Sequence, residues 1–305
     1  MDDPARALAT CVAPDDDSLL VGADFWPRSV DRRTPGLAIW PSGSFGTVAL
    51  RLSKARDELA MMMQAAAGAL KPGGTLYLFG GNDEGIVSAG RRLGEVFDAV
   101  ETVQTKHHSR VFAARGPKAG AKTALAEWRS TFGFHVGEAN FSHATYPGVF
   151  ASGRLDEGTR FLLETMPAVG GAVLDFACGS GAIAQVLARR HGDARFTLAD
   201  IDAVSLEAAK QNVAGTAAVL QIARLADLPA AKFDAIVSNP PIHSGVAQSF
   251  AVLRDFLSTA PDYLATGGEI FLVVQRTVPV GKLGGALKLR KHAGDDAFTV
   301  WALHR

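Results

Sequence analysis

The sequence predicts an α/β fold with two tandem Rossmann-like domains, of which only the second carries a ligand-binding turn. Three observations lead to this prediction. Short apolar runs typical of buried strands alternate with helical stripes along the whole chain. A glycine-rich turn, ACGSG at residues 177–181, follows one of these runs in the second half. The 305 residues also suffice for two domains of ordinary size.

The first domain is expected over residues 1–115. Its longer helix is predicted to begin after Ser53 as N-cap and to end at the Pro-Gly-Gly of residues 72–74. Strands are expected at 18–22, 36–40, 75–80, 99–104 and 109–114, and helices at 53–70 and 85–97. A linker with a short helix should follow over 116–139. Between residues 106 and 129 six basic side chains accompany one acidic side chain, which suits either phosphate contacts or a solvated linker.

The second domain is expected over residues 140–305. Its strands and helices alternate, which predicts a mainly parallel sheet with right-handed crossovers. Strands are expected at 173–176, 196–200, 217–222, 233–238 and 269–275, and helices after 182 and at 205–213 and 246–264.

An internal repeat indicates that the two domains are copies. Each half contains a strand, a long helix and a second strand in the same order. In the first half, the strand ends at Pro-Ser-Gly (41–43) and the second strand follows residues 71–74. In the second half, the strand ends at residues 239–241 and the second strand follows residues 266–268. Ile39 to Gly73 spans 34 positions, and Ile236 to Gly267 spans 31. We predict a duplication in which only the second copy kept its chemistry. Chance similarity of two ordinary βαβ units is the alternative.

Composition and charge restrict the function classes. The formal net charge is zero, so any binding of nucleic acid must come from local patches. The two cysteines and the lack of a CxxC or His/Cys cluster argue against a disulfide framework and against a metal site. The longest apolar run, 59–70, contains Gln64 and is too short for a membrane span, and the acidic N-terminus lacks an apolar signal core. A cytoplasmic protein with no membrane association is expected.

The glycine turn predicts a cofactor site. Gly179 and Gly181 allow a tight turn and a close approach of a ligand, and the following helix presents free N–H groups. The pattern G-x-G-x-x-A, with Asp200 about twenty residues on, also fits a dinucleotide. Asp175, however, would repel a pyrophosphate and would suit the ammonium group of an amino acid.

A second motif, Asn239-Pro240-Pro241, follows the strand predicted at 233–238. A dehydrogenase has no particular use for this sequence, whereas an enzyme that methylates a planar nitrogen does. The asparagine side-chain oxygen and the Pro240 carbonyl can each accept one N–H of an exocyclic amine, and the prolines stiffen both acceptors.

These residues resemble the class I S-adenosylmethionine-dependent methyltransferases, and among them the RsmC-type ribosomal RNA guanine-N2 methyltransferases. The matching segments are YPGVF at 146–150, LDEGTRFLL at 155–163, the motif at 175–181 and SNPPIHSG at 238–245. The resemblance is closest over 140–275 and looser in the N-terminal half, where the family carries a degenerate copy. It implies two tandem Rossmann-like methyltransferase domains with the N-terminal one degenerate. The family usually has an aromatic residue where this chain has Ile242.

The resemblance also implies roles for individual residues. S-Adenosylmethionine is the expected cofactor, with its ammonium near Asp175, its ribose on Asp200 and its adenine amino group on Asp227, while Ile201 packs on the adenine face. The residues expected to bind the cofactor are Gly158, Thr159, Asp175, Ala177, Cys178, Gly179, Gly181, Asp200, Ile201, Asp227 and Asn239. For Asp200 and Asp227, a turn or helix-cap carboxylate is the alternative. Asp202 is expected to cap the next helix.

The expected catalytic residues are Asn239, Pro240, Pro241 and Ile242, with Ile242 as an apolar wall for the base and His243 in a local hydrogen bond. The implied reaction is methyl transfer to the N2 amine of a guanine in 16S-type ribosomal RNA. The expected partner is ribosomal RNA or the small subunit, with the target base taken out of its stack, and the chain is expected to be a monomer. Alternatives are a methyltransferase for a protein glutamine or an adenine, a nicotinamide-dependent oxidoreductase, and a non-catalytic RNA-binding assembly factor.

Overall fold

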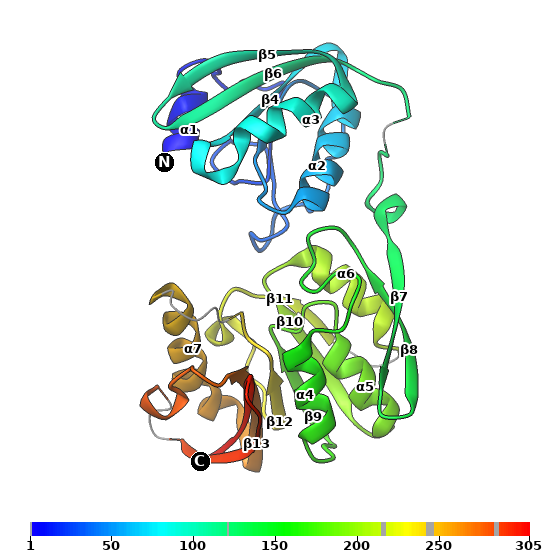
Figure 1. Cartoon of the computed structure of the whole chain (residues 1–305), viewed down its shortest axis with the longest axis vertical. Helices are drawn as coiled ribbons and strands as arrows, with labels where there is room; N and C mark the ends of the chain where they lie inside the picture. Colours follow the sequence, from blue (N-terminus) through cyan, green and yellow to red (C-terminus); the bar gives the residue numbers. More distant parts are fainter. Residues whose placement is uncertain (1, 121, 215–217, 242–246, 284–286) are drawn as a thin grey trace. The chain divides into compact units, whose positions relative to one another are not determined.

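The computed structural model describes residues 2–120, 122–214, 218–241, 247–283 and 287–305. It divides the chain into two compact units, Met1–Arg129 and Ser130–Arg305 (Figure 1). The division falls inside the linker predicted over 116–139. Residues beyond Ser130 belong to a strand of the second unit, because Phe134 and Val136 are buried and the Phe134 ring stacks on Phe141 with centroids 5.1 Å apart.

The second unit is built on a seven-stranded sheet in the order β11-β10-β9-β12-β13-β15-β14. The strands are β9 Ala172–Phe176, β10 Arg195–Asp200, β11 Ala218–Gln221, β12 Phe233–Ser238, β13 Leu264–Gln275, β14 Lys288–Gly294 and β15 Phe298–His304. Neighbouring strands from β11 to β13 run parallel, and β15 is antiparallel to both β13 and β14. The predicted parallel sheet is therefore present, and its strand order reverses at β9.

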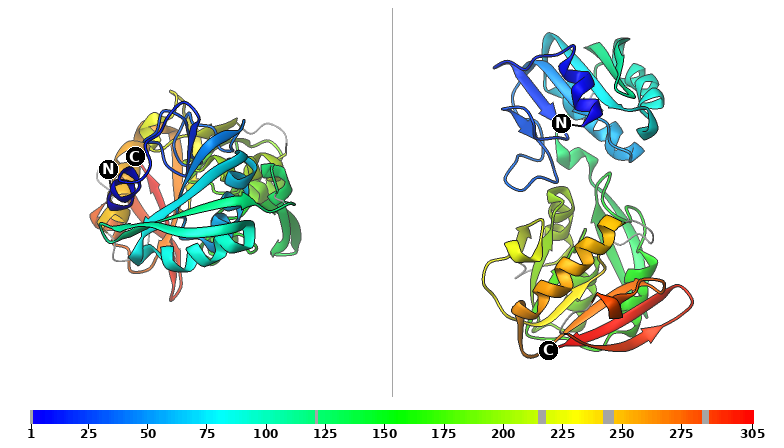
Figure 2. Two further views of the ribbon diagram at one scale, coloured as in Figure 1. Left: turned by 90° about the horizontal axis from the view of Figure 1, so that it is seen from above. Right: turned by 90° about the vertical axis from the view of Figure 1, so that its left-hand side faces the viewer.

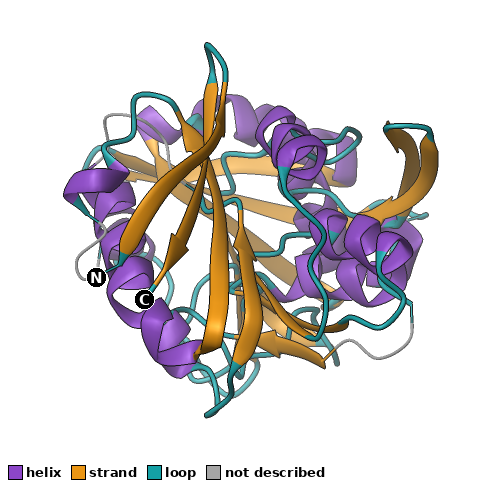
Figure 3. Cartoon of the chain, turned by 90° about the horizontal axis from the view of Figure 1, so that it is seen from below, coloured by secondary structure: helices purple, strands orange, loops and turns teal. Residues whose placement is uncertain are grey.

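Helices cover both faces of this sheet. One face packs against α4 Glu157–Thr165, α5 Ala182–Arg190 and α6 Ala203–Asn212, and the other against α7 Ala247–Thr259 (Figure 1). Figure 3 shows these helix layers in purple on either side of the strands. Short 3₁₀ turns lie at Leu225–Asp227 (η3), Ala260–Tyr263 (η4) and Val280–Lys282 (η5). The alternation of side chains along each strand explains the two separate apolar cores.

A two-stranded hairpin, β7 Ser130–Val136 and β8 Ala139–Thr145, packs against the helices of the second unit. Its backbone carbonyls accept hydrogen bonds from α5: Gln185 Nε2 donates to Ser142 O over 2.9 Å and Arg189 Nη1 to Asn140 O over 2.7 Å. The Arg189 guanidinium also lies 5.2 Å from the centroid of the Phe141 ring. The hairpin thus holds the helix that follows the glycine turn.

The first unit has a six-stranded sheet in the order β2-β1-β3-β4-β6-β5. Figure 2 shows the ribbon of this unit, blue to cyan-green, from two further directions. Its strands are β1 Ser18–Val21, β2 Ser29–Val30, β3 Phe45–Arg51, β4 Leu70–Gly81, β5 Phe97–Lys106 and β6 Ser109–Pro117. Helices α2 Arg56–Gly68 and α3 Ile86–Val96 pack on one face and α1 Asp3–Ala9 on the other. Two 3₁₀ turns, η1 Asn82–Glu84 and η2 Leu125–Trp128, complete the unit.

The two sheets share one pattern of strand pairing. In the first unit Phe45 pairs with Leu70 and Thr47 with Thr75, and the register shifts between them. In the second unit Phe233 pairs with Leu264 and Ala235 with Glu269, with a shift at the same place. In both sheets the next strand pairs antiparallel, and its hairpin partner forms the edge. The register therefore supports the predicted duplication.

The prediction of a strand at residues 36–40 was wrong. The strand that corresponds to β12 is β3, and residues 36–40 contribute only an isolated bridge between Ala38 and Val30. Trp40 instead donates its indole N–H to Thr123 O over 2.7 Å. In the corrected alignment Arg51 takes the place of Asn239, and it is ion-paired to Glu84 over 2.7 Å. The first copy thus fills its equivalent position with a salt bridge.

The predicted N-cap of the first long helix was also wrong. Ala55 occupies the N-cap position of α2 without a side-chain cap bond. Ser53 accepts a hydrogen bond from Ala55 N over 3.2 Å and donates to the buried Glu58 carboxylate over 2.6 Å. Glu58 is in turn ion-paired with buried Arg32 over 3.2 Å. The serine therefore belongs to a buried polar cluster, where its hydroxyl satisfies a charged group.

Candidate active site

The carboxyl ends of β9, β10 and β12 meet at the point where the strand order reverses. Asp175 of β9 pairs with Leu198 of β10 and with Val237 of β12. Buried Ser238 closes the end of β12 by donating its hydroxyl to Phe176 O over 2.7 Å. Ligands of open α/β sheets bind in the crevice at such a switch point. The glycine turn and Asn239 thus begin at adjacent strand ends.

The turn after β9 uses three left-handed backbone positions. Ala177, Gly179 and Gly181 have φ values of 56°, 54° and 81°. A Cβ built on Gly179 would meet no atom within 4 Å, so the turn is open there. A Cβ on Gly181 would lie 3.1 Å from the Cβ of Ala209 and 3.2 Å from Val213 Cγ2, both on the α6 side. Gly181 therefore permits the close packing of α5 on α6, while Gly179 leaves space for a ligand.

Asp175 is a fully buried carboxylate with an unused acceptor. Its Oδ2 accepts a hydrogen bond from Ala184 N at the start of α5 over 3.2 Å. Its Oδ1 has no hydrogen-bond partner among the residues that the structure describes. Burial raises the pKa of Asp175 to about 8, and the nearby Asp200 carboxylate adds to this rise. Such a group is suited to a cationic ligand that would restore its charged form.

Asp200 lies at the end of β10 and joins the two ligand-facing loops. Its Oδ2 accepts a hydrogen bond from Gly179 N over 2.8 Å, and its Oδ1 accepts one from Asp202 N over 2.8 Å. Burial raises the pKa of Asp200, although hydrogen bonds from the backbone of Asp202, Gly179 and Ile201 oppose this rise. A carboxylate offers about four acceptor sites, so Asp200 retains capacity to accept from hydroxyl groups. The neighbouring Ile201 is 42% exposed, so its apolar side chain is accessible to a ligand.

Asn239 is held in one orientation by the start of α4. Its Nδ2 donates to Asp156 Oδ2 over 2.8 Å and to Thr159 Oγ1 over 2.9 Å. Because a carboxylate only accepts hydrogen bonds, the nitrogen must face Asp156 and the amide oxygen must face away. Asp156 is also the N-cap of α4, where its Oδ2 accepts from Thr159 N over 2.9 Å. The side-chain oxygen of Asn239 is thereby left to accept hydrogen bonds from a ligand.

A buried polar network supports the glycine turn from behind. His143 of β8 has Nε2 at 2.8 Å from Ser180 Oγ and Nδ1 at 2.7 Å from Gln185 Oε1. Asn212 at the end of α6 donates to Ala144 O and to Ser180 O, each over 2.9 Å, and accepts from Ala144 N over 2.6 Å. Burial lowers the pKa of His143, so its neutral form is favoured. The network fixes Ser180 inside the turn.

We expect Asn212→Leu to destabilise the protein by about 3–5 kcal/mol, because it leaves three buried backbone groups of Ala144 and Ser180 without partners. Urea unfolding checks this, with Lys210→Ala on the exposed side of the same helix as control. Removing the exposed Lys210–Glu207 pair should cost less than about 1 kcal/mol. Equal unfolding midpoints for the two variants would argue against a structural role of the network.

Sequence reasoning did not find several of these residues. Asp156 and His143 act through contacts with Asn239 and Ser180, which lie 83 and 37 positions away in the chain. For Asp156 a local signal exists, because an aspartate directly before the start of a helix is typical of an N-cap. For Asn212 the local pattern gives no signal, since a polar residue at a helix end is usually solvated.

Other predicted site residues have different surroundings from those expected. Asp227 is exposed in η3, where it accepts from Arg224 N over 3.0 Å and pairs with the Arg224 side chain over 3.1 Å, so the alternative of a cap carboxylate describes its present contacts. Its hydrogen bond from Arg224 lowers the pKa of Asp227. Cys178 has its side chain in the apolar core. Asp202 caps α6, as predicted. Ile242 and His243 lie outside the described residues.

Two further features bear on the class of site. No group of His, Cys, Asp or Glu side chains that could hold a metal ion occurs within the described ranges. Among the same residues, none of the helices has the length and apolarity required to cross a membrane.

Comparison with models of known protein families assigns both units of the chain to a family. Residues 140–297 match the methyltransferase small domain, and residues 31–132 match the N-terminal domain that accompanies it. The chain belongs to the methyltransferase small domain family. The predicted family is thus confirmed, and the order of its two domains agrees with the two units of the structure.

Similar members of the family carry one name. The chain is 32% identical over 290 residues to the ribosomal RNA small subunit methyltransferase C of Pseudomonas aeruginosa (strain LESB58), covering 90% of this chain and 85% of that protein. It is 34% identical over 247 residues to the protein of the same name from Hahella chejuensis (strain KCTC 2396), covering 80% and 72%.

A solved structure has the same two-domain fold. It is the T. thermophilus 16S rRNA N2 G1207 methyltransferase (RsmC) in complex with AdoMet and guanosine. The TM-score is 0.82 at 22% identity, and the match covers 100% of this chain and 92% of the other. The predicted fold of two tandem Rossmann-like methyltransferase domains is confirmed by this likeness.

Proposed function

We propose that this chain transfers a methyl group from S-adenosylmethionine to the exocyclic N2 amine of a guanine in 16S-type ribosomal RNA. The observation that carries the proposal is the orientation of Asn239. Its amide nitrogen is tied to Asp156 and Thr159, which leaves its oxygen to accept a hydrogen bond at the switch point of the sheet. An acceptor fixed in this way suits an N–H donor such as an exocyclic amine.

The chemistry follows from the electronic structure of that amine. Its lone pair is delocalised into the ring, so it is a poor nucleophile while it remains planar. The Asn239 oxygen and the Pro240 carbonyl would each accept one N–H, favour a tetrahedral nitrogen and direct its lone pair toward the methyl group. Pro240 is buried and followed by Pro241, so the second acceptor is also preorganised. No strong general base is required, because the N–H becomes acidic once the nitrogen is alkylated.

The residues around the glycine turn fit S-adenosylmethionine. The unpartnered Oδ1 of buried Asp175 is suited to an ammonium, and Asp200 keeps free acceptor sites for ribose hydroxyls. Gly179 leaves open space, and Ile201 presents an exposed apolar side chain for the adenine face. When bound, the cofactor supplies an electrophilic methyl group on a sulfonium. We also assign Gly158, Ala177 and the backbone of Cys178 to this site, and Asp227 to the adenine amino group if it leaves Arg224.

The choice of guanine and ribosomal RNA is supported by the relatives. Proteins that match most of this chain are named ribosomal RNA small subunit methyltransferases C, and the T. thermophilus enzyme is described as an N2 methyltransferase acting on G1207 of 16S rRNA. The geometry of Asn239 alone would also serve a protein glutamine or an adenine. Ribosomal RNA or the small subunit would be the partner, the site of action would be the cytoplasm, and we expect a monomer.

Methylation with radiolabelled S-adenosylmethionine tests the function. Small-subunit rRNA, assembled small subunits and total protein are offered in parallel, with Asn239→Ala as the matched inactive variant. We expect label in RNA, recovered as N2-methylguanosine and lost in the variant. Label in protein would move the function to the glutamine class. Measurable cofactor binding without label in any fraction would contradict the proposal and favour a scaffold role.

We expect Thr159→Val to lower kcat about tenfold, because the nearly isosteric side chain cannot accept the Asn239 N–H and the amide loses one of its two anchors. KM for the cofactor should change little if Thr159 acts mainly through Asn239. Single-turnover methylation measures the effect, and Thr159→Ser, which retains the hydroxyl, should restore most of the rate. A Thr159→Ser variant as slow as Thr159→Val would show that packing of the methyl group matters instead.

A further inference from the structure

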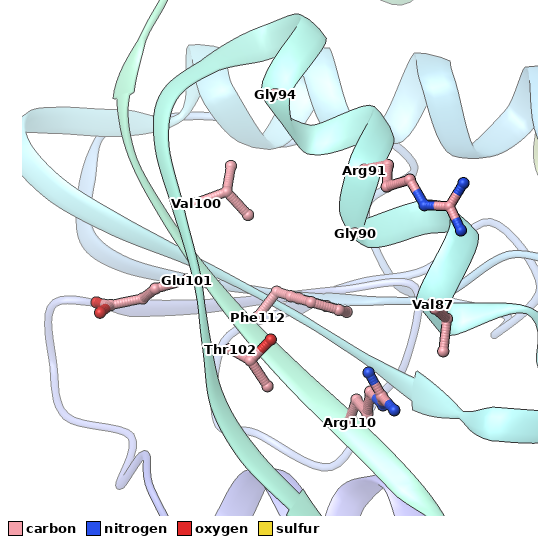
Figure 4. A pocket seen from close by; sticks show the side chains of 9 residues that line it. All are labelled: Val87, Gly90, Arg91, Gly94, Val100, Glu101, Thr102, Arg110 and Phe112. Carbon is pink, nitrogen blue, oxygen red and sulfur yellow. The ribbon is translucent and has the colours of Figure 1, made fainter.

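The first unit contains a pocket that the proposed reaction does not use. It has a volume of about 380 Å³ and lies between helix α3 and the β5–β6 hairpin (Figure 4). Its walls combine apolar, small, polar, basic and acidic residues, namely Val87, Gly90, Arg91, Gly94, Val100, Glu101, Thr102, Arg110 and Phe112. A volume of this size falls in the range of small-ligand sites, about 300–1,000 Å³.

Two arginines give one side of this pocket a positive charge. Figure 4 shows Arg91 and Arg110 extending to the same side of the pocket, near Val87, and Glu101 extending to the opposite side. Glu101 is paired with Arg115 over 2.6 Å, whereas neither Arg91 nor Arg110 forms an ion pair with any residue that the structure describes. The Nε of Arg110 is buried without a hydrogen-bond partner among them. Together the two side chains offer guanidinium donors suited to an anion.

The position of Arg110 in the sheet supports a role for its charge in binding an anion. Side chains alternate along β6, so Arg110 lies on the face of Phe112 and Ala114, which belong to the core under α2 and α3. A charged residue on such a face is costly unless an anion satisfies it. In the second unit, the strand pairing places buried Thr299 at the equivalent position. The charge is therefore a feature of the first unit alone.

Two glycines keep the helical wall of the pocket thin. A Cβ on Gly90 would lie 2.4 Å from the Phe112 ring, so only glycine allows that ring to pack under the helix. Gly94 is exposed on the last turn of α3, and a Cβ there would meet no atom within 4 Å. Glycine in a helix costs about 1 kcal/mol relative to alanine. The packing of Phe112 accounts for Gly90, whereas no neighbouring atom accounts for Gly94 at the rim of the pocket.

We propose that this pocket binds one nucleotide of single-stranded RNA. The phosphate lies between Arg91 and Arg110, and the base lies over Val100 and the edge of Phe112, with the Thr102 hydroxyl available for a sugar or base contact. Guanidinium groups suit phosphate oxygens, and apolar or aromatic surfaces suit bases of any sequence. The inference rests on the proposed RNA substrate and assigns a holding site for it outside the catalytic unit.

Binding of a fluorescein-labelled single-stranded RNA over a range of salt concentrations tests the pocket. Arg91→Gln/Arg110→Gln is compared with Arg56→Gln, which removes an exposed arginine of the same unit from outside the pocket. We expect the double variant to bind RNA roughly tenfold more weakly than wild type. The slope of log K against log salt should fall in magnitude by about 0.7 for each phosphate that the variant no longer neutralises. The Arg56→Gln variant should retain the wild-type affinity.

Two further readouts separate this site from the catalytic one. KM for RNA should rise in the double variant by the same factor as its dissociation constant, with kcat and cofactor affinity unchanged. The Nε–H resonance of Arg110 should shift when RNA is added to the wild-type protein. Equal RNA affinities and salt slopes for the double variant and Arg56→Gln would overturn the pocket assignment. A shift of that resonance with inorganic phosphate or a free nucleotide, but not with RNA, would overturn the RNA assignment. If the wild-type protein transfers no methyl group to RNA, the proposed function is refuted, but the binding measurements on the pocket remain valid.

Discussion

Asn239→Ala should lower kcat for methyl transfer by about 10²–10³-fold while the cofactor dissociation constant stays within about threefold. The variant removes the oxygen that Asp156 and Thr159 leave pointing away from α4. That oxygen is fixed before the substrate arrives, so it can favour the tetrahedral nitrogen without the cost of reorganisation. The lost interaction is strongest in the transition state, and the effect therefore falls on kcat rather than on KM.

Single-turnover methylation of ribosomal RNA, together with calorimetric titration of the cofactor, measures this effect. Asn140→Ala is the matched control, because it removes the same side chain from an exposed position in the β7–β8 hairpin. A rate for Asn239→Ala within about threefold of wild type would exclude the asparagine from the reaction. A parallel loss of rate in Asn140→Ala would instead point to general damage to the fold.

Local patterns in the sequence locate the elements that frame the site. The strand predicted at 233–238 is observed as β12, Phe233–Ser238. It could be predicted because the apolar run at 235–237 lies between Asp234 and the prolines at 240–241. The turn after β9 could also be predicted from the sequence, because two closely spaced glycines after an apolar run are typical of a tight strand-to-helix turn. Strand order at the switch point then follows from the general behaviour of parallel α/β sheets.

The first unit was harder to predict for a local reason. Strand β3 contains Gly46, which weakens the pattern of a strand, whereas residues 36–40 form a short apolar run. A Cβ at Gly46 would lie 2.6 Å from Asp17 Oδ2, so the Asp17 carboxylate would have to move to accept a side chain there. This contact joins two residues that are far apart in the sequence, so periodicity along β3 cannot reveal it. The same limit applies to the Asp156–Asn239 contact, which only the folded chain creates.

Cofactor affinity should increase with pH, because the buried Asp175 must lose a proton to hold an ammonium. Burial places its pKa at about 8 in the free protein, so the carboxyl is mostly neutral near pH 6. Binding of a cation favours the ionised form and therefore releases a proton. Between about pH 6 and pH 7 the dissociation constant of S-adenosylmethionine should fall by up to tenfold, the limit for one released proton.

The same shift affects folding with the opposite pH dependence. Asp175 ionises near pH 4 in the unfolded chain but near pH 8 in the folded one, so the folded state binds more protons in between. Its stabilising contribution is therefore complete below about pH 4 and is lost as the pH rises toward about 8. Asp175→Asn should abolish both dependences, becoming relatively more stable than wild type as the pH rises and binding the cofactor weakly at every pH.

Calorimetry in buffers of different ionisation enthalpy counts the released proton directly, with the exposed Asp193→Asn as control. The ammonium group of S-adenosylmethionine also titrates. The Asp175→Asn variant reports the titration of this ammonium alone, because the variant lacks the Asp175 carboxyl. Any pH dependence that survives in the variant belongs to the ligand, and the difference from wild type belongs to Asp175. Zero proton release by wild type near pH 6 would mean that Asp175 is already ionised there, and its unpartnered oxygen would then require a different explanation.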